Sequence, residues 1–205
     1  SFNAVTIPEV LKGAGYRTMM SGKWHVAGDF MARKVDSWRV GDVDHPTPRQ
    51  RGFDRFYGIV DGVTHIFSPH YMLEDDRRVD VFPDDFYFTD AITDKAIGMV
   101  GEAVAEDQPF FLYLAHTAPH WPLHAHPEDI ARYDGVYNGG WDSVRTARHE
   151  QMNAMGLFQT NWDISPRDTD VHPWSAEANH DWEARKMATY AAMVDRMDQS
   201  IGRLV

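Results

Sequence analysis

The sequence contains no cysteine, so the chain has neither a disulfide framework nor a thiolate metal site. Basic residues are also scarce, with 20 Lys and Arg against 31 Asp and Glu and a net charge of −11. Nucleic acids and anionic membrane faces both attract basic surfaces. No apolar run approaches the roughly 20 residues of a membrane-spanning helix. The composition therefore argues against nucleic-acid and membrane partners.

Several catalytic signatures are missing as well. The sequence has no P-loop and no dinucleotide fingerprint. No serine lies in a G-x-S-x-G elbow, so a hydrolase triad has no nucleophile here. The adjacent carboxylates at 75–76 and 84–85 lie in polar turns and offer no paired acid/base signature.

The pattern of elements predicts an α/β fold. A capping box at Thr6 and Glu9 predicts a helix that ends at Gly13 or Gly15, and a short strand follows over 16–21. Helical spacing predicts a second helix from 89 or 90 to about 105. The apolar run 109–115 lacks polar alternation, which favours a strand buried on both faces.

The remaining segments give weaker signals. Residues 45–48 and 52–58 are interpreted as turns with aromatic anchors, and 74–78 as a solvated charged face. A glycine-rich turn is expected over 134–142 and a helix over 145–157, followed by a polar, turn-rich segment. The last helix runs from about 182 to the end, with one apolar stripe: Met187, Tyr190, Ala191, Val194, Met197, Ile201 and Leu204.

The ends of the sequence lack the usual features of a complete domain. It opens at Ser1 without Met, and it stops at Val205 inside a helical pattern without a cap. We expect residues 1–205 to be the central part of a longer catalytic domain, cut at both ends.

The first candidate site is residues 22–25 (GKWH), directly after the first expected strand. Ligands of α/β folds gather beyond the carboxyl ends of strands. In an extended backbone, Lys23 and His25 point to one side and Trp24 to the other, where it can anchor the loop. An ammonium suits the oxygens of a tetrahedral anion, and an imidazole transfers protons near neutral pH. The alternative is a surface lysine beside a structural histidine.

The second candidate site follows the strand 109–115 and holds four histidines: His116, His120, His124 and His126. Such a cluster invites a zinc interpretation. However, two prolines exclude a helix that would align them, and no HExxH pattern is present. The alternatives are ordinary loop histidines or one functional histidine.

Four stretches in this order resemble the type I sulfatases, the arylsulfatase group of the alkaline-phosphatase-like superfamily. They are 6–25, which contains GYRTMMSGKWH, then 51–58 (RGFDRFYG), 109–122 with APHWP at its centre, and 190–198 (YAAMVDRMD). The resemblance spans nearly the whole chain. It implies an α/β domain around a mixed sheet and the hydrolysis of sulfate esters, with a formylglycine nucleophile and one calcium ion.

The resemblance also implies roles for individual residues. Lys23 is expected to contact the sulfate and the nucleophile. His25 is expected to hydrogen-bond the hydrated aldehyde and to help expel sulfate. His120 is expected to bind sulfate or to protonate the leaving alkoxide. The substrate is then a small-molecule or glycan sulfate ester, and family habit favours a periplasmic or secreted location.

The departures from the family pattern concern the nucleophile and the metal. The Cys-x-Pro-x-Arg motif and the early paired Asp ligands of calcium are expected before Ser1. The later Asp-Asn ligands and a second active-site Lys are expected beyond Val205. The 205 residues alone are therefore expected to be inactive. The alternatives are a phosphomonoester, phosphodiester or phosphonate hydrolase of the same superfamily and a non-catalytic domain that keeps the fold.

A further hypothesis concerns the irregular segment 61–76. Its residues His65, Phe67, His70 and Tyr71 are candidates for the wall of a leaving-group pocket. The alternative is ordinary aromatic packing beneath a long loop.

Overall fold

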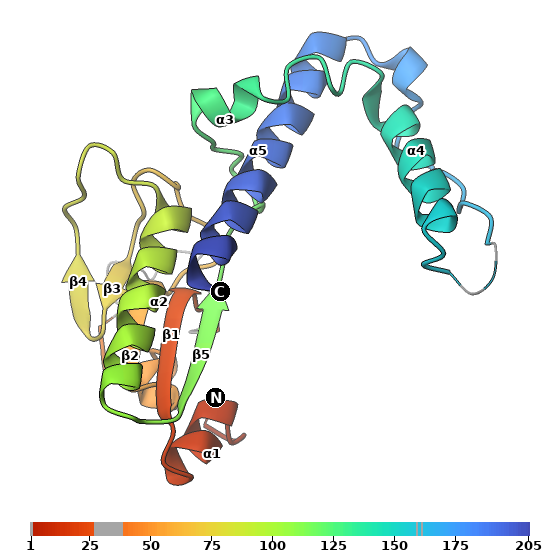
Figure 1. Ribbon diagram of the computed structural model, residues 1–205. Coiled ribbons are helices and arrows are strands. Elements are labelled where there is room, and N and C mark those ends of the chain that lie inside the picture. The colour runs from red at the N-terminus through yellow and green to blue at the C-terminus, as the bar shows by residue number, and fades with distance from the viewer. Residues whose placement is uncertain (1, 27–38, 159, 161) are drawn as a thin grey trace. The chain divides into compact units, whose positions relative to one another are not determined.

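The computed structural model describes residues 2–26, 39–158, 160 and 162–205 (Figure 1). The chain divides into two compact units. The first comprises Ser1–His124 and Val194–Val205, and the second comprises Ala125–Met193. The last helix contributes to both units.

The first unit is built on one mixed sheet. Its elements are α1 (Ile7–Gly13), β1 (Arg17–Lys23), η3 (Arg49–Arg51), β2 (Arg55–Ile59), β3 (Met72–Glu74), β4 (Arg77–Val79), α2 (Phe88–Ala105), β5 (Phe110–Ala115) and the end of α5 (His180–Leu204). The strand order is β4-β3-β2-β1-β5. β1 pairs in parallel with both β2 and β5, whereas β2–β3 and β3–β4 are antiparallel. The expected α/β class with a mixed sheet flanked by helices is confirmed.

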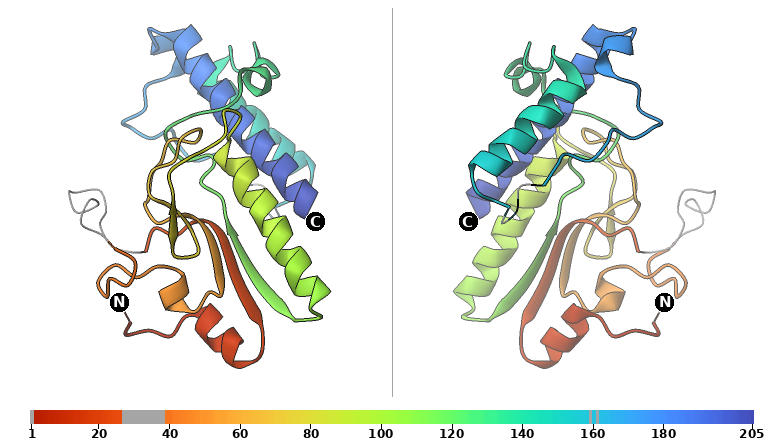
Figure 2. Two further views of the ribbon diagram at one scale, coloured as in Figure 1. Left: turned by 90° about the vertical axis from the view of Figure 1, so that its left-hand side faces the viewer. Right: turned by 90° about the vertical axis from the view of Figure 1, so that its right-hand side faces the viewer.

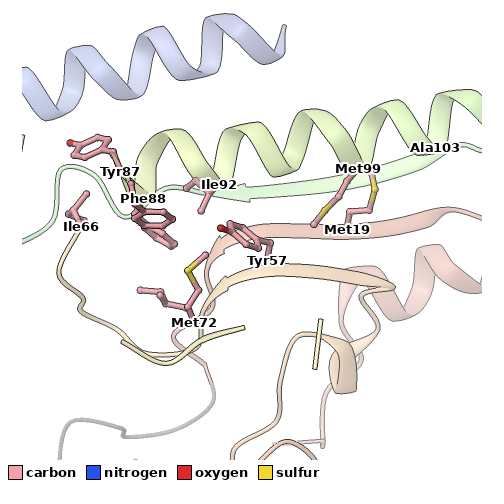
Figure 3. Close-up of a cluster of buried hydrophobic side chains, with 11 residues drawn as sticks. Met19, Tyr57, Ile66, Met72, Tyr87, Phe88, Ile92, Met99 and Ala103 are labelled. Carbon is pink, nitrogen blue, oxygen red and sulfur yellow. The ribbon is translucent and has the colours of Figure 1, made fainter. Parts of the chain in front are cut away.

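Consecutive residues of a strand belong to two separate hydrophobic clusters, because side chains point alternately to the two faces of a sheet. Met19 of β1 lies in the cluster beneath α2, whereas Met20 lies in the cluster on the opposite face. α2 packs on β1 and β5 and covers one face of the sheet (Figures 1 and 2). Phe88 and Ile92 of α2 are fully buried there (Figure 3). β1 is therefore an interior strand of the sheet, between β2 and β5, and its side chains are buried on both faces.

Local signals set the helix boundaries. The Thr6 hydroxyl accepts from the Glu9 N–H, and the Glu9 carboxylate accepts from the Thr6 N–H, so the expected capping box starts α1. Asp90 in the first turn of α2 accepts hydrogen bonds from Arg196 and Ser200, which joins the end of α5 to α2. Burial alone would raise the pKa of Asp90, but the Arg196 and Ser200 hydrogen bonds hold it below its usual value.

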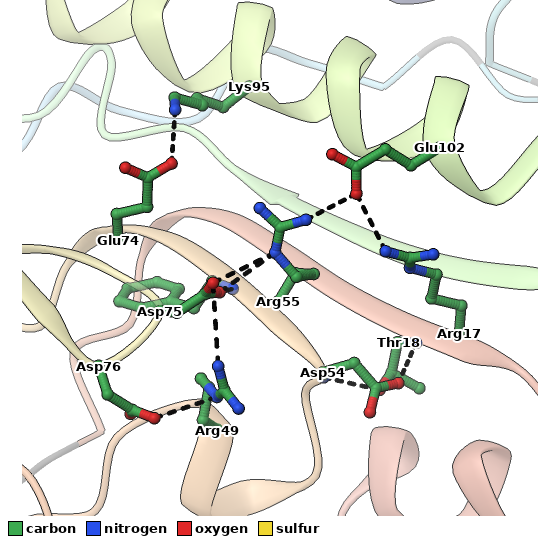
Figure 4. Close-up of polar contacts among 11 residues, drawn as sticks. Arg17, Thr18, Arg49, Asp54, Arg55, Glu74, Asp75, Asp76, Lys95 and Glu102 are labelled. Carbon is green, nitrogen blue, oxygen red and sulfur yellow. Dashed lines mark hydrogen bonds and ion pairs between the residues drawn. The ribbon is translucent and has the colours of Figure 1, made fainter.

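An ionic network covers the amino-terminal edge of the sheet (Figure 4). Arg17 of β1 and Arg55 of β2 both pair with Glu102 near the end of α2, at 3.0 and 2.6 Å. Asp75 accepts from the Phe56 N–H at 2.9 Å and pairs with Arg55. These charges lie at the edge of the sheet opposite to Lys23, so the network is structural.

One segment interpreted as turns contains a strand. Residues 52–58 contain most of β2, so that expectation was wrong. The charged run 74–78 spans the turn between β3 and β4, and its residues 76–78 are exposed, as expected of a solvated charged face. The sequence did not predict β2 because it contains Gly58, and glycine normally weakens strands. Here the close approach of β1 requires glycine: a Cβ at Gly58 would lie 1.8 Å from the Gly22 carbonyl oxygen.

β5 is confirmed as a strand, but it is not buried on both faces within the described residues. It lies at the edge of the sheet, and its residues Phe110 and Tyr113 are 39% and 47% exposed. The continuous apolar run predicted two-sided cover, whereas α2 covers only one face of this strand.

The second unit is helical. It contains α3 (Pro127–Ala131), α4 (Gly140–Ala154), η4 (Trp174–Ala176) and the first part of α5. Ala188 and Ala192 of α5 pack with Ile130. The helix expected over 145–157 begins five residues earlier, at Gly140. The apolar stripe expected to be the buried face of α5 was wrong, because the buried face is shifted around the helix. Tyr190 is 49% exposed, because the buried positions are Ala184, Ala188, Ala192, Met193 and Ser200. Nowhere in the described part of the chain is a helix both long and apolar enough to cross a membrane.

Candidate active site

Two glycines bring the carboxyl ends of β2, β1 and β5 into close contact. Gly22 pairs with Gly58 on one side and with Ala115 on the other. A Cβ at Gly22 would lie 2.0 Å from the Ala115 carbonyl oxygen, and the φ of Gly22 is +122°. Because any larger residue would push the strands apart, glycine at this position fixes where Lys23 leaves the sheet.

Lys23 is the last residue of β1 and is half-buried. Burial lowers the pKa of its ammonium, whereas the negative charge of Asp61 opposes this shift. Within the part of the chain that the structure describes, the ammonium donates no hydrogen bond. Its three N–H groups are therefore available for the oxygens of an anion.

Trp24 anchors the loop that follows, as the alternation of residues 23–25 predicts. Its indole N–H donates to the Pro46 carbonyl at 2.8 Å, and its backbone N–H donates to the Ile59 carbonyl at 2.9 Å. Its ring meets Phe53 edge-on, with centroids 6.2 Å apart. With Trp24 fixed on three sides, its two neighbours leave the sheet at fixed positions.

His25 departs from the extended backbone. Its φ is +54°, in the left-handed region that residues with a Cβ rarely adopt. The alternation argument that places Lys23 and His25 on one side therefore does not extend to His25. The imidazole is exposed and lies directly against the Cα of Gly62, in the loop after β2. Backbone strain at a candidate ligand position is typical of functional sites.

His120 lies in the tight turn that follows β5. Its backbone N–H donates to the Thr117 carbonyl at 2.9 Å, and its Nδ1 lies 2.7 Å from the Trp121 carbonyl oxygen. A carbonyl only accepts, so Nδ1 carries a proton and donates it. Nε2 is then the ring nitrogen not used in this contact, and it becomes a donor when the imidazole is protonated. The side chain is exposed.

The four histidines after β5 have different surroundings. Among the described residues there is no group of three or more His, Asp or Glu side chains that could hold a metal ion. The two ring nitrogens of His116 are buried, and neither has a hydrogen-bond partner in this part of the chain. The ring of His124 lies against that of His65, with centroids 4.1 Å apart and the rings tilted by 49°. The described residues therefore add no support to the zinc interpretation, which the two prolines already disfavoured.

The aromatic segment 61–76 serves more than one purpose. Phe67 packs against the hydrophobic cluster beneath α2 and lies 5.1 Å from Tyr87, and Tyr71 stacks under the Arg78 guanidinium at 4.8 Å. These two follow the aromatic-packing alternative. His65 instead contacts His124 and so joins the loop after β2 to the segment after β5.

Burial of His116 and His124 makes the stability of the first unit depend on pH. Burial lowers the pKa of both imidazoles below 6.5. At His116 the negative charge of Asp90 opposes this shift, whereas at His124 the charge of His65 lowers the pKa further. Between the folded and unfolded pKa values the unfolded state binds more protons, so acid favours unfolding. We expect full stability above pH 6.5 and a loss of at most about 1.4 kcal/mol per pH unit per group below it.

Thermal unfolding of the whole protein across this range tests the expectation. Replacement His116→Phe should flatten the dependence, whereas His70→Gln, at an exposed histidine, should leave it unchanged. An equally steep loss of stability with acid in the His116 variant would contradict this role.

Sequence reasoning missed Asp61 and Gly62, which come two and three residues after β2. The rule that ligands gather beyond strand ends applies to this loop as well. The signal was lost because 52–58 was interpreted as turns. The two residues lie beside Lys23 and His25, respectively.

Comparison with known proteins decides the family. The sulfatase family model matches residues 2–205. The chain belongs to the sulfatase family. The arylsulfatase of Klebsiella aerogenes is 32% identical over 213 residues, which cover 98% of this chain and 42% of that protein. The N-acetylglucosamine-6-O-sulfatase of Bacteroides thetaiotaomicron is 27% identical over 171 residues, 78% of this chain and 26% of that protein.

Solved structures agree with this family. Ps i-CgsB in complex with k-i-k-neocarrahexaose superposes with a TM-score of 0.61 at 25% identity, covering 99% of this chain and 36% of that one. BT4656 in complex with its substrate D-glucosamine-2-N,6-O-disulfate gives a TM-score of 0.59 at 22% identity, covering 98% and 46%, which supports the fold. This sulfatase chain spans less than half the length of these relatives.

Proposed function

We propose that the whole protein hydrolyses sulfate monoesters and that Lys23, His25 and His120 form one wall of its active site. The observation that carries the proposal is the parallel pairing of β1 with β5. Gly22 pairs with Ala115, so the loops that bear Lys23 and His120 leave the sheet at the same edge. The sulfatase match over residues 2–205 supplies the reaction class.

The chemistry of these groups suits a sulfate ester. The Lys23 ammonium donates to sulfate oxygens, and the Asp61 charge favours its protonated form. His25, in its strained conformation, presents an imidazole to the same edge. When the S–O bond to the leaving group breaks, the electron pair stays on the leaving oxygen. A protonated His120 donates its Nε2 proton to that oxygen and becomes neutral.

The described residues do not supply the calcium and formylglycine typical of the family. They contain no metal-binding cluster, and the sequence has no cysteine. We therefore place the nucleophile and the calcium ligands outside these 205 residues, in keeping with a chain that covers 42% of its Klebsiella relative. On this proposal, the 205 residues are the central part of a longer catalytic domain.

The substrate class follows from relatives and remains part of the proposal. One relative carries the name of a sugar-6-O-sulfatase, and one structural neighbour is bound to a disulfated glucosamine. We propose a sulfated sugar or an aryl sulfate as substrate. Export to the periplasm or the medium, where such compounds occur, fits this role.

An assay of the whole protein with 4-nitrophenyl sulfate and 4-nitrophenyl phosphate tests the proposal. We expect sulfate release, abolished by removal of calcium, and a much slower reaction with the phosphate. Preference for the phosphate would support the alternative of a phosphoester hydrolase, and absence of both activities would support a non-catalytic domain.

A further inference from the structure

The loop after β2 contacts His25 and carries Asp61, whose negative charge acts on Lys23. An ideal Cβ at Gly62 would lie 2.3 Å from Nε2, 2.6 Å from Cδ2 and 2.8 Å from Cε1 of His25. The space next to the Gly62 Cα is therefore filled by the His25 ring. The neighbouring Asp61 accepts a hydrogen bond from the Gly62 N–H at 2.5 Å, which fixes the turn.

Asp61 provides the negative charge that acts on Lys23. The strand pairing places two other loops beside this ammonium: His25 follows on β1, and His116 follows β5. Burial lowers the pKa of His116, so its ring is neutral at neutral pH and adds no charge. Lys23 pairs with Ile59 of β2, and Asp61 follows two residues further on, so among the described neighbouring groups Asp61 is the negative charge that favours the protonated form of Lys23.

We propose that Asp61 and Gly62 are the positioning residues of the sulfate-binding wall. Gly62 leaves the space in which the His25 imidazole rests, and the carboxylate of Asp61 favours the charged form of Lys23. This inference rests on the proposed sulfatase function. It adds two residues that touch neither the substrate nor the reacting atoms and that act through Lys23 and His25.

Gly62 can be tested without unfolding the protein. Its backbone lies outside the left-handed region, so alanine is compatible with the fold, and only the end of the His25 side chain has to move. In Gly62→Ala we expect kcat on an aryl sulfate to fall about 10²-fold, the effect typical of a displaced catalytic group. Gly98→Ala is the matched control, because a Cβ there meets nothing within 4 Å.

A double-mutant cycle shows whether Gly62 acts through His25. In a His25→Ala background the ring is absent, so Gly62→Ala should cause no further loss of kcat. An additive loss would mean that Gly62 has another role and would overturn this half of the inference. So would an unchanged kcat in the single variant of an active enzyme.

Asp61→Asn isolates the charge, because the amide oxygen still accepts from the Gly62 N–H. Without the negative charge, the pKa of Lys23 falls further, so the variant loses rate mainly at alkaline pH. We expect the ratio of its rate at pH 6 to that at pH 9 to exceed the wild-type ratio by about two- to fivefold. Asp84→Asn, at an exposed turn residue, is the control. An unchanged ratio would overturn the role of Asp61.

A second readout separates this inference from the proposed function. If the wild-type protein hydrolyses no sulfate ester, the proposed function fails, and the NMR signals of the His25 imidazole decide the geometry. These signals should shift in Gly62→Ala and stay unchanged in Gly98→Ala. Identical His25 spectra in both variants would overturn the contact itself.

Discussion

Lys23→Ala in the whole protein is expected to lower kcat/KM for a sulfate monoester. The expected loss of transition-state stabilisation is about 2–4 kcal/mol, which is typical of removing one donor from a preorganised anion site. The ammonium is half-buried and lies at the point where three strands converge. A partly desolvated cation interacts strongly with the charge that develops on sulfate oxygens. Steady-state kinetics on one aryl sulfate measure the effect.

Lys12→Ala provides the matched control for this variant. Lys12 forms an ion pair with Asp54 at 2.5 Å, and its side chain is 54% exposed. It lies on α1, before β1, so its loss removes the same charge far from the carboxyl ends of the strands. The control should retain its kcat/KM. An intact kcat/KM in Lys23→Ala would remove Lys23 from the mechanism.

His120→Ala is expected to reduce the rate according to the leaving group. With an alkyl or sugar sulfate, whose leaving oxygen is strongly basic, general-acid loss should cost about 10²- to 10⁴-fold in kcat. With 4-nitrophenyl sulfate the leaving phenolate needs little protonation, so the loss should be much smaller. The Nε2 of the ring has no hydrogen-bond partner among the described residues, because the contact to the Trp121 carbonyl uses Nδ1, and this makes the role possible.

A series of sulfate esters with graded leaving groups measures this dependence. His180→Ala is the control, since His180 is an exposed histidine at the start of α5 to which no role in the site is assigned. An equal loss for all leaving groups would show that His120 binds sulfate and does not transfer a proton. No loss for any ester would contradict both roles.

Local sequence signals predicted those parts of the fold that depend on neighbouring residues. The capping box of Thr6 and Glu9 was correct because its hydrogen bonds span three residues. The long helices α2 and α5 and the apolar strand β5 also follow from short-range patterns. The buried stripe of α5 did not follow, because the buried positions are mostly alanines, with Met193, and most of the larger apolar residues of this helix are partly or fully exposed.

Long-range contacts explain why the sequence did not predict β2 or the contact of Gly62 with His25. β2 contains a glycine that only the approach of the Gly22 carbonyl explains, and that carbonyl belongs to a strand more than 30 residues away. The contact of Gly62 with His25 likewise joins two loops of the fold. Neither has a local signature. Sequence motifs could therefore point to Lys23, His25 and His120 as candidates, whereas the contact of Gly62 with His25 required the structure.

A crystal structure of the whole protein with bound inorganic sulfate tests the central claim most directly. The account predicts one sulfate ion with oxygens within about 3 Å of the Lys23 Nζ and of ring nitrogens of His25 and His120. A sulfate bound elsewhere, or three side chains that face different regions of the protein, would contradict it.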